Sequence, residues 1–452
     1  MSEKATMEKI VSLAKRRGFI FPGSNIYGGL SGFWDYGPYG VMLKNNITRL
    51  WWRIFVEERE DVHGLDSAIL MRQDVWQASG HVGGFVDAVV SDTVNGRQFR
   101  ADHLLEDQGY DPTGMSIEDI SNHIKENNIK SPNGNPLSEV STFNMMFETC
   151  IGAGKGEESK SYLRPETAQG IFANFKNIMD SVHPQLPFGI GQIGKAFRNE
   201  IAPRDFIFRA REFEQMELEY FVHPDEWEKW FDHYREEIWR WMDMIGLDRD
   251  SVHELEVPAE DRAHYSKRTI DFEFDYPFGR KELYGLAYRT DFDLKSHASK
   301  SGQELSYLDQ EKNERVVPHV IEPSLGVDRT LLAVLVSAYR EDEMNGEKRV
   351  FLSLPVAIAP VRVAVFPLMK NKSDLVSKAR EVFEILKKEI PRVIYDESGS
   401  IGKRYRRQDE IGTPHCVTVD FDTLDDQTVT VRDRDSGEQK RLKIEDLLAE
   451  LK

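Results

Sequence analysis

Residues 195–221 carry the side chains best suited to chemistry in this sequence. The segment, KAFRNEIAPRDFIFRAREFEQMELEYF, interleaves arginines, carboxylates and aromatic rings, a mixture that an apolar core strand does not tolerate. From residue 213 onward polar and apolar residues alternate, and this period of two predicts a half-buried antiparallel strand with one side facing a ligand. The residues on that side are Phe213, Gln215, Glu217 and Glu219.

The chemistry that this segment suggests is nucleotide binding. Residues 196–200 are predicted to form a partner strand and residues 201–208 the loop of a long hairpin. Guanidiniums suit a polyphosphate, a flat ring suits a stacked base, and a carboxylate can accept a hydrogen bond from an exocyclic amine. The residues that the hairpin would gather are Arg198, Glu200, Arg209, Arg211 and Phe213. A surface hairpin laced with ion pairs is less favoured, because exposed pairs contribute little stability.

Residues 189–195, GIGQIGK, resemble a phosphate-binding P-loop up to the last position. Ala196 stands where a Ser or Thr hydroxyl would hold magnesium, and FRNE follows where a helix should begin. We therefore reject a P-loop.

Length and composition predict a globular protein of two or three domains. The chain has 452 residues, of which 40% are hydrophobic and 30% charged. Its longest apolar runs are too short for a membrane span, and residues 1–4 begin no apolar signal core, so we expect a cytoplasmic protein with no membrane partner. Cys150 and Cys416 belong to no CxxC or Cys/His cluster, so neither a disulfide framework nor a zinc site is predicted.

The net charge of −18 argues against non-specific binding of nucleic acid. Residues 356–452 contain 18 Lys/Arg and 18 Asp/Glu, so the acidic excess lies in residues 1–355. An RNA contact is least opposed in the neutral C-terminal part, although balanced charge is also ordinary for a globular domain.

Three segments of the first 355 residues allow more than one interpretation. Residues 41–56 predict an aromatic helix whose rings favour a subunit interface, with core packing as the alternative. Residues 97–135 look like an insertion with a helix at 117–126. The insertion opens with Arg100-Ala-Asp-His103, for which two interpretations stay open: residues of a site, or a solvated loop. Glu166 and Thr167 fall near a helix start, where Thr167 could simply cap the helix.

The remaining periodicity predicts an α+β body followed by an alternating tail. In the body we expect strands at 66–71, 143–150, 269–276, 282–291 and 317–322, and helices at 7–17, 227–245 and 330–339. After residue 355 strands at 361–366, 392–396, 415–420 and 428–432 alternate with helices at 373–389, 401–410 and 444–451, at parallel-sheet spacing.

Three stretches resemble the class II aminoacyl-tRNA synthetases: FRNE…RAREFEQMELEYF is similar to motif two, EPSLGVDRT to motif three, and the aromatic helix after GFWDYGPYG to motif one. Within that class the chain resembles the homodimeric glycyl-tRNA synthetases over nearly its whole length, including RPETAQG. The resemblance implies an α+β fold with an antiparallel-sheet catalytic domain at residues 1–355, carrying insertions at about 97–135 and 252–318. It also implies a C-terminal α/β anticodon-binding domain at residues 356–452.

The activity that the resemblance implies is glycine–tRNA ligation, with ATP, Mg²⁺, glycine, tRNA(Gly) and a second copy of the chain as cofactors and partners. Arg198 would hold the α-phosphate, Arg209 and Arg329 the outer phosphates, Phe213 the adenine and Glu282 the metal, with Arg198 and Arg329 catalytic. The implied ATP-binding residues are Arg198, Asn199, Glu200, Phe208, Arg209, Arg211, Phe213, Glu282, Leu283, Gly326, Asp328 and Arg329.

Glycine offers no side chain to grip, so the resemblance implies recognition through its ammonium and rejection of larger amino acids by a clash. The implied glycine-binding residues are Arg100, Glu166, Phe213, Gln215, Glu217, Glu322, Ser324 and Gly326. Ser324 stands where motif three often begins with glycine, and Gln169 stands where many relatives have glutamate; both departures agree with the glycine enzymes.

For tRNA, the basic cluster around Arg404, Arg406 and Arg407 is the expected backbone contact, with a solvated helix face as the alternative. Two other functions stay open at this point: an ATP-dependent amino-acid ligase that does not use tRNA, and a non-catalytic RNA-binding regulator. A class I synthetase is disfavoured because the sequence has no HIGH motif.

Overall fold

The catalytic part of this computed structural model is organised around one seven-stranded sheet, in the order β12-β13-β14-β17-β11-β10-β3. The structure describes residues 5–112, 114–154, 156, 159–309, 313–344 and 346–451, so residues 1–4, used above in the argument about a signal core, lie outside them. All neighbouring strands run antiparallel except β10 and β3. The strands are β3 (Val62–Gly64), β10 (Phe188–Phe197), β11 (Glu212–Val222), β12 (Val252–Glu256), β13 (Arg268–Tyr276), β14 (Gly279–Thr290) and β17 (His319–Gly326).

Helices cover the two faces of this sheet unequally. One face packs on the main core, to which α1 (Met7–Arg16), α2 (Pro38–Trp52), α8 (Trp227–Met244) and α10 (Val327–Ala338) contribute. The other face is covered at one end by α7 (Ala168–Val182) and α9 (Phe292–Ser301), whose apolar residues form a smaller core with β10 and β11. The uncovered end of that second face is where the site lies.

The predicted hairpin is present, but the prediction of its first strand at residues 196–200 is wrong for residues 198–200, which lie in the loop. β10 pairs with β11 from Phe188 opposite Phe221 to Phe197 opposite Glu212, and residues 198–211 form the connecting loop. The glycine-rich segment 189–194 is therefore part of a strand, which confirms the rejection of a P-loop.

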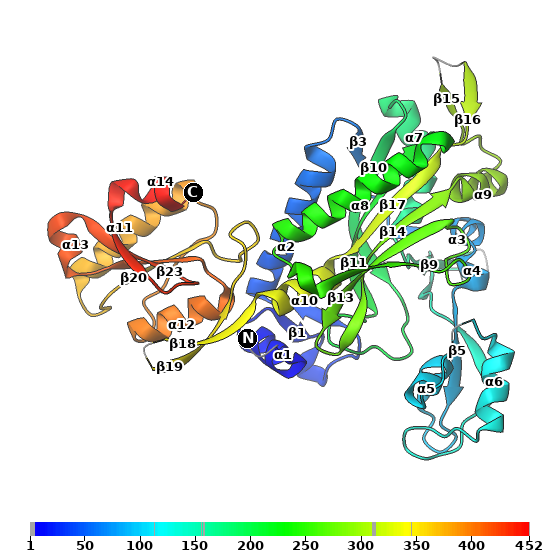
Figure 1. Cartoon of the computed structure of the whole chain (residues 1–452), viewed down its shortest axis with the longest axis horizontal. Coiled ribbons are helices and arrows are strands. Elements are labelled where there is room, and N and C mark those ends of the chain that lie inside the picture. Colours follow the sequence, from blue (N-terminus) through cyan, green and yellow to red (C-terminus); the bar gives the residue numbers. More distant parts are fainter. Residues whose placement is uncertain are drawn as a thin grey trace.

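The interpretation of residues 252–318 as an insertion is wrong for most of its length. β12, β13 and β14 lie within this range, and β14 pairs directly with β17 in the middle of the sheet. The excursion that does project is the small hairpin of β15 (Tyr307–Asp309) and β16 (Glu314–Val316), at the top of Figure 1.

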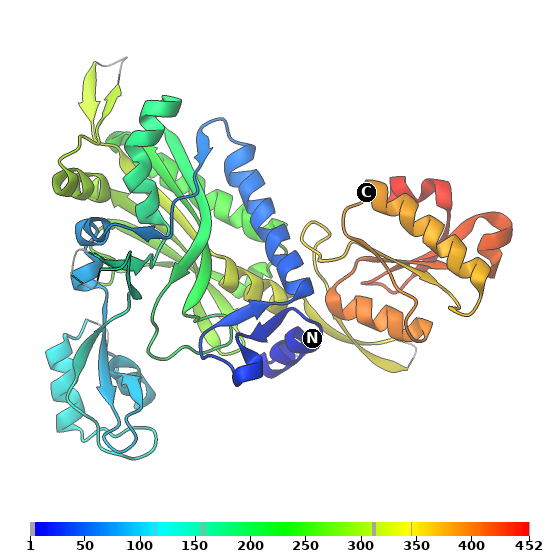
Figure 2. The ribbon, with the colours of Figure 1, turned by 180° about the vertical axis from the view of Figure 1, so that it is seen from behind.

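A separate small unit projects from the other end of the body, in cyan in Figures 1 and 2. It is wider than the predicted insertion at 97–135, because β5 (Val86–Ser91) pairs with both β6 (Gln98–Arg100) and β7 (Ser141–Asn144). Helices α5 (Ala101–Asp107) and α6 (Ile117–Glu126) pack on this sheet through a core of their own. We refer to residues 86–144 as the projecting subdomain.

Short elements connect the subdomain and the N-terminal segment to the body. They are β1 (Ile20–Pro22), β2 (Trp34–Tyr36), β4 (Leu70–Met71), α3 (Gln73–Ala78), α4 (His81–Gly84), β8 (Glu148–Cys150) and β9 (Lys160–Leu163). The strand predicted at 143–150 is thus two strands in different sheets, because β7 belongs to the subdomain and β8 pairs with β9.

The rings of the aromatic helix belong to the core of this chain. Trp51, Ile54 and Phe55 are at most 4% exposed and lie in the main core, so the preference for an interface on these side chains is wrong.

The C-terminal domain has a mixed sheet, β21-β20-β22-β23-β24. β20 (Val363–Pro367) runs parallel to β21 (Val393–Tyr395) and β22 (His415–Val419), as expected, but β23 (Thr428–Asp433) and β24 (Gln439–Lys443) continue the sheet antiparallel. Its helices are α11 (Ser373–Glu389), α12 (Ile401–Ile411), α13 (Phe421–Asp426) and α14 (Leu447–Leu451).

The two domains are joined by a hairpin of β18 (Tyr339–Met344) and β19 (Glu347–Leu352). This hairpin was not predicted from the sequence. Arg349 on β19 is 1% exposed, and it binds Asp342 at 2.8 Å and the carbonyl of Arg434 at 2.6 Å. The C-terminal domain is therefore anchored to the body by buried charge-assisted hydrogen bonds.

Candidate active site

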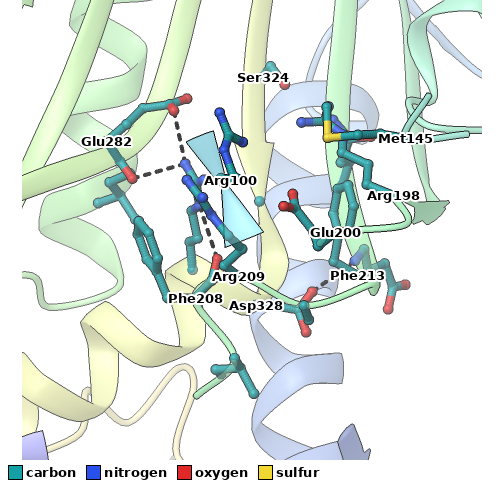
Figure 3. A pocket seen from close by; sticks show the side chains of 17 residues that line it. Arg100, Met145, Arg198, Glu200, Phe208, Arg209, Phe213, Glu282, Ser324 and Asp328 are labelled. Atoms are coloured by element: carbon teal, nitrogen blue, oxygen red, sulfur yellow. Dashed lines mark hydrogen bonds and ion pairs between the residues drawn. The ribbon is translucent and has the colours of Figure 1, made fainter. Parts of the chain in front are cut away.

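The first cavity at the open end of the sheet has a volume of about 330 Å³ and is drawn in Figure 3. Its walls come from β11, β14, β17, the start of α10, the loop 198–211 and the projecting subdomain. The lining residues are Arg100, Met145, Arg198, Glu200, Ile207, Phe208, Arg209, Ala210, Phe213, Glu214, Gln215, Glu282, Leu283, Ser324, Gly326, Asp328 and Arg329.

The arginines of this cavity differ in whether a carboxylate of the same chain neutralises their positive charge. Arg329 pairs with Glu282 at 3.0 Å, and Arg100 pairs with Asp87 at 2.8 Å. Among the described residues Arg198 and Arg209 form no ion pair, and the Arg198 side chain donates only to the carbonyl of Pro165, at 3.1 Å. These two guanidiniums are thus the ones most available to an anion.

An aromatic ring lies beside the available charge. The guanidinium carbon of Arg198 is 5.3 Å from the ring centroid of Phe213 and 5.4 Å from that of Phe85. Phe208 lies under Arg329 at 4.5 Å. A cavity with flat rings and unpaired guanidiniums suits a ligand that combines a base with phosphates.

A second cavity of about 280 Å³ adjoins the first. Its lining residues are Glu166, Arg198, Gln215, Glu217, Val257, Asp261, Ala263, Tyr265, Thr269, Asp271, Glu282, Gly285, Ala287, Glu322 and Ser324. Arg198, Gln215, Glu282 and Ser324 line both cavities, so the two spaces meet at these residues.

Strand pairing positions the centre of the second cavity. Glu217 on β11 lies opposite Ser324 on β17, whose hydroxyl donates to the Glu217 carboxylate at 2.9 Å. The same carboxylate accepts from Gln215 at 2.7 Å, from the backbone N–H of Thr167 at 3.1 Å and from the Thr167 hydroxyl. Thr167 is the N-cap residue of α7 but makes no side-chain capping bond, so its hydroxyl serves Glu217 and the simple capping interpretation is wrong.

Negative charge dominates this second cavity. Glu166, Glu217 and Glu322 line it, while the buried Arg289 behind them pairs with Glu322 at 2.7 Å and with Asp293 at 2.8 Å. Burial opposes ionisation of Glu166, but His81 at 3.4 Å and Arg289 lower its pKa. Burial and neighbouring carboxylates raise the pKa of Glu322 to about 8 and also raise that of Glu217. The cavity is therefore short of positive charge, and a ligand cation would relieve this repulsion.

Most of the predicted site residues are brought together. Those in the two cavities are Arg100, Arg198, Glu200, Phe208, Arg209, Phe213, Gln215, Glu282, Leu283, Ser324, Gly326, Asp328 and Arg329 in the first, and Glu166, Glu217 and Glu322 in the second. The carboxylate of Asp328 already accepts from Tyr36 at 2.6 Å and from the Glu214 backbone at 2.8 Å, which ties α10 to β11.

Two predicted ATP-binding residues line neither cavity. The backbone of Asn199 donates to Met145 at 2.7 Å, and the side chain of Arg211 donates to the carbonyls of Glu200 and Ser31 at 2.9 and 3.0 Å. Arg211 therefore braces the loop that carries Glu200.

The sequence prediction also missed residues that line the site. Asp271 and Thr269 stand on the polar side of β13, where burial together with Glu282 and Glu273 raises the pKa of Asp271 to about 7. Their alternation with Ile270 and Phe272 was a readable signal. Tyr265, in the loop before β13, had no such signal.

In the C-terminal domain the predicted RNA contact is wrong for Arg404. Its side chain is 1% exposed and donates to the carbonyls of Pro367 and Gly399, so it cannot reach a phosphate. Arg406 and Arg407 are about one-third exposed and pair with Glu347 at 2.8 Å and Asp396 at 2.5 Å.

Sheet, cavities and C-terminal domain together define a class II aminoacyl-tRNA synthetase. The family described as the tRNA synthetase class II core domain (G, H, P, S and T) matches residues 149–338, and the anticodon binding domain family matches residues 362–452. Among similar proteins, a glycine–tRNA ligase from Caldanaerobacter subterraneus subsp. tengcongensis is 51% identical, over 98% of this chain and 97% of the relative.

Glycine–tRNA ligases from Clostridium acetobutylicum and Acetivibrio thermocellus are each 50% identical, over 99% of this chain and 98% of the relative. The chain belongs to the glycine–tRNA ligase family. No helix in the described part of the chain is long and apolar enough to cross a membrane.

Proposed function

We propose that this enzyme activates glycine with ATP to glycyl-adenylate and then transfers the glycyl group to the 3′-terminal ribose of tRNA(Gly). The observation that carries the proposal is the meeting of the two cavities at Arg198, Gln215, Glu282 and Ser324. One cavity offers unpaired guanidiniums and rings, and the other offers carboxylates. A nucleotide and an amino acid bound in them would have their reacting ends in contact.

In the first step a carboxylate oxygen of glycine attacks the α-phosphorus of ATP. The new phosphorus–oxygen bond forms while the bond to the bridging oxygen breaks, and pyrophosphate leaves with the electron pair. Arg198, at the junction, would hold both the α-phosphate and the carboxylate, and Arg209 and Arg329 would hold the outer phosphates. No protein nucleophile is required, so positioning and fixed positive charge supply the rate.

The residues around the base and the metal have matching roles. Phe213 would stack on adenine, with Glu200 accepting from its amino group. Glu282 fits a Mg²⁺ role, because its side chain is half exposed and Mg²⁺ takes one or two carboxylates together with substrate phosphates. Mg²⁺ held there would neutralise charge on the phosphate oxygens.

In the second step a hydroxyl of the terminal ribose attacks the glycyl carbonyl carbon. The ester bond forms, the bond between that carbon and the phosphate oxygen breaks, and AMP leaves with the electron pair while the hydroxyl proton passes to a phosphate oxygen of the leaving AMP. The glycine ammonium would stay among Glu166, Glu217 and Glu322 with Ser324, and Arg100 would approach the substrate from the projecting subdomain. Binding through the ammonium charge suits a substrate without a side chain.

The test is charging of a tRNA(Gly) transcript with radiolabelled glycine. We expect an acid-precipitable product that base hydrolyses, and ATP–pyrophosphate exchange that depends on glycine. Exchange without any charging of tRNA would favour a tRNA-independent ligase instead.

We assign tRNA binding to the C-terminal domain, at residues 356–452, with the catalytic domain at residues 1–355. Arg406 and Arg407 remain the proposed contacts, because their guanidiniums are partly exposed and each can exchange its carboxylate partner, Glu347 or Asp396, for a phosphate.

We also propose a homodimer that uses the N-terminal loop around Asn25–Tyr27. Ile26 is 87% exposed, Tyr27 86% and Leu30 54%, an apolar patch of the kind that marks an interface. Sedimentation should give a dimer for the natural chain and a monomer for Ile26→Asp with Tyr27→Asp. Leu308→Asp, an exposed apolar position on β15, is the control and should remain dimeric.

A cytoplasmic location is the further proposal. Both cysteines are free thiols, as expected in a reducing compartment.

A further inference from the structure

The projecting subdomain places a histidine against the nucleotide cavity. His103 lies in the first turn of α5, three residues after Arg100, and its Nε2 is 3.4 Å from Nη1 of Arg209. The two residues are 106 positions apart in the chain, so this contact joins the subdomain to the loop 198–211.

The direction of this hydrogen bond is fixed by chemistry. A guanidinium has only donors, so Nε2 of His103 must accept and the ring must be neutral, with its proton on Nδ1. Burial and the nearby cations Arg100, Arg204 and Arg209 lower the pKa of His103 to about 4, although Asp102 opposes them. The acceptor is therefore present throughout the neutral range.

Within the part of the chain that the structure describes, Arg209 has no carboxylate to fix the orientation of its guanidinium, so a neutral acceptor can serve this purpose. It lines the cavity and forms no ion pair with the described residues, and its one side-chain hydrogen bond is to His103. A carboxylate in this position would neutralise the guanidinium, whereas a neutral imidazole orients it and leaves its charge available to a phosphate.

The neighbouring residues hold the histidine in place. Asp102 accepts two hydrogen bonds from Arg100, at 3.1 and 2.5 Å, and Asp87 on β5 accepts a third at 2.8 Å. The first turn of α5 is thereby fixed to the subdomain sheet, with Arg100 lining the cavity and His103 facing Arg209.

We propose that His103 is a positioning residue for ATP: it orients the Arg209 guanidinium toward the outer phosphates and so makes docking of the projecting subdomain part of nucleotide binding. This inference rests on the proposed adenylation reaction. It assigns His103 a role that concerns ATP and not glycine.

The experiment measures glycine-dependent ATP–pyrophosphate exchange with each substrate varied in turn. For His103→Ala we expect the KM for ATP to rise about five- to tenfold and the KM for glycine to stay within twofold. His103→Gln, which supplies an amide oxygen as acceptor, should recover most of the loss, and His103→Lys, which supplies a cation, should be worse than alanine.

A control and a double variant separate positioning from folding. His123→Ala alters a histidine of α6 in the same subdomain. This ring packs edge-to-face against Tyr110 with ring centroids 4.3 Å apart, and the variant should leave the KM for ATP unchanged. In an Arg209→Lys background, His103→Ala should add less than twofold, because its effect passes through Arg209. An unchanged KM for ATP in His103→Ala, equal rises for both substrates, a glutamine variant no better than alanine, or full additivity with Arg209→Lys would each overturn the inference. Loss of exchange in the natural chain would instead refute the proposed function.

Discussion

Replacing Glu217 by glutamine should separate glycine binding from ATP binding. Glu217 is 2% exposed, and its two carboxylate oxygens accept four hydrogen bonds, from Thr167 twice, Gln215 and Ser324. A carboxamide has one acceptor oxygen, which must face the fixed backbone N–H of Thr167. Its NH₂ group then faces Gln215 and Ser324, whose amide and hydroxyl can turn to accept.

The magnitude follows from the charge that is lost. A hydrogen bond to a charged group contributes about 1.5–3 kcal/mol, so removing the charge that faces the ammonium should raise the KM for glycine roughly tenfold to a hundredfold. The KM for ATP should change less than threefold, because Glu217 lines only the second of the two cavities. ATP–pyrophosphate exchange with glycine and ATP varied separately measures both values.

Glu219→Gln is the matched control on the same strand. Glu219 is fully buried, lines neither cavity, and has no hydrogen-bond partner on either carboxylate oxygen among the described residues. Burial and Glu322 raise the pKa of Glu219 well above its ordinary value and so favour the neutral carboxyl, which an amide of the same shape replaces with little change. Equal rises in both KM values for Glu217→Gln, or an equal defect in Glu219→Gln, would refute this account of the pocket.

Further outcomes follow from other parts of the structure. The KM for glycine should fall as the pH rises from 6.5 toward 8, by at most about tenfold per pH unit. The reason is that the pKa of Glu322 is raised to about 8 and binding of the ammonium requires the ionised carboxylate. The KM for ATP over the same range is the control. Phe213→Ala should raise the KM for ATP by roughly five- to a hundredfold, because stacking on a base contributes about 1–3 kcal/mol, while Phe213→Tyr should retain most of the affinity. Arg406→Glu with Arg407→Glu should raise the tRNA concentration needed for charging and leave pyrophosphate exchange intact; a loss of both activities would contradict it. Arg404→Met should lower the melting temperature instead, because it leaves two buried carbonyls without a hydrogen-bond donor, and each unsatisfied carbonyl costs about 1–3 kcal/mol of stability.

Local periodicity was enough to predict the strand that carries the centre of the second cavity. The alternation after residue 213 gave the strand and the face of Gln215 and Glu217, because side chains on a strand change sides at every residue. Which strands lie side by side depends on contacts between distant segments, and the pairing of β14 with β17 could not be read from either strand alone. That is why residues 252–318 were mistaken for an insertion.

Burial of individual charged residues was also beyond the sequence. Helix α12 carries arginines on several sides. Nothing in its pattern indicates that Arg404 is buried against carbonyls inside the domain while Arg406 stays partly exposed and donates to the carbonyl of Lys348 on β19. His103 is a similar case, since its partner lies 106 positions away on another element.

The central claim is that the carboxylate-lined cavity accepts glycine and joins it to the α-phosphate of ATP. The most direct test is ATP–pyrophosphate exchange measured separately with each of the twenty amino acids in the absence of tRNA. We predict exchange with glycine and at most a small fraction of that rate with alanine or serine. Exchange that is equally fast with a larger amino acid, or that is absent with glycine, would contradict the account.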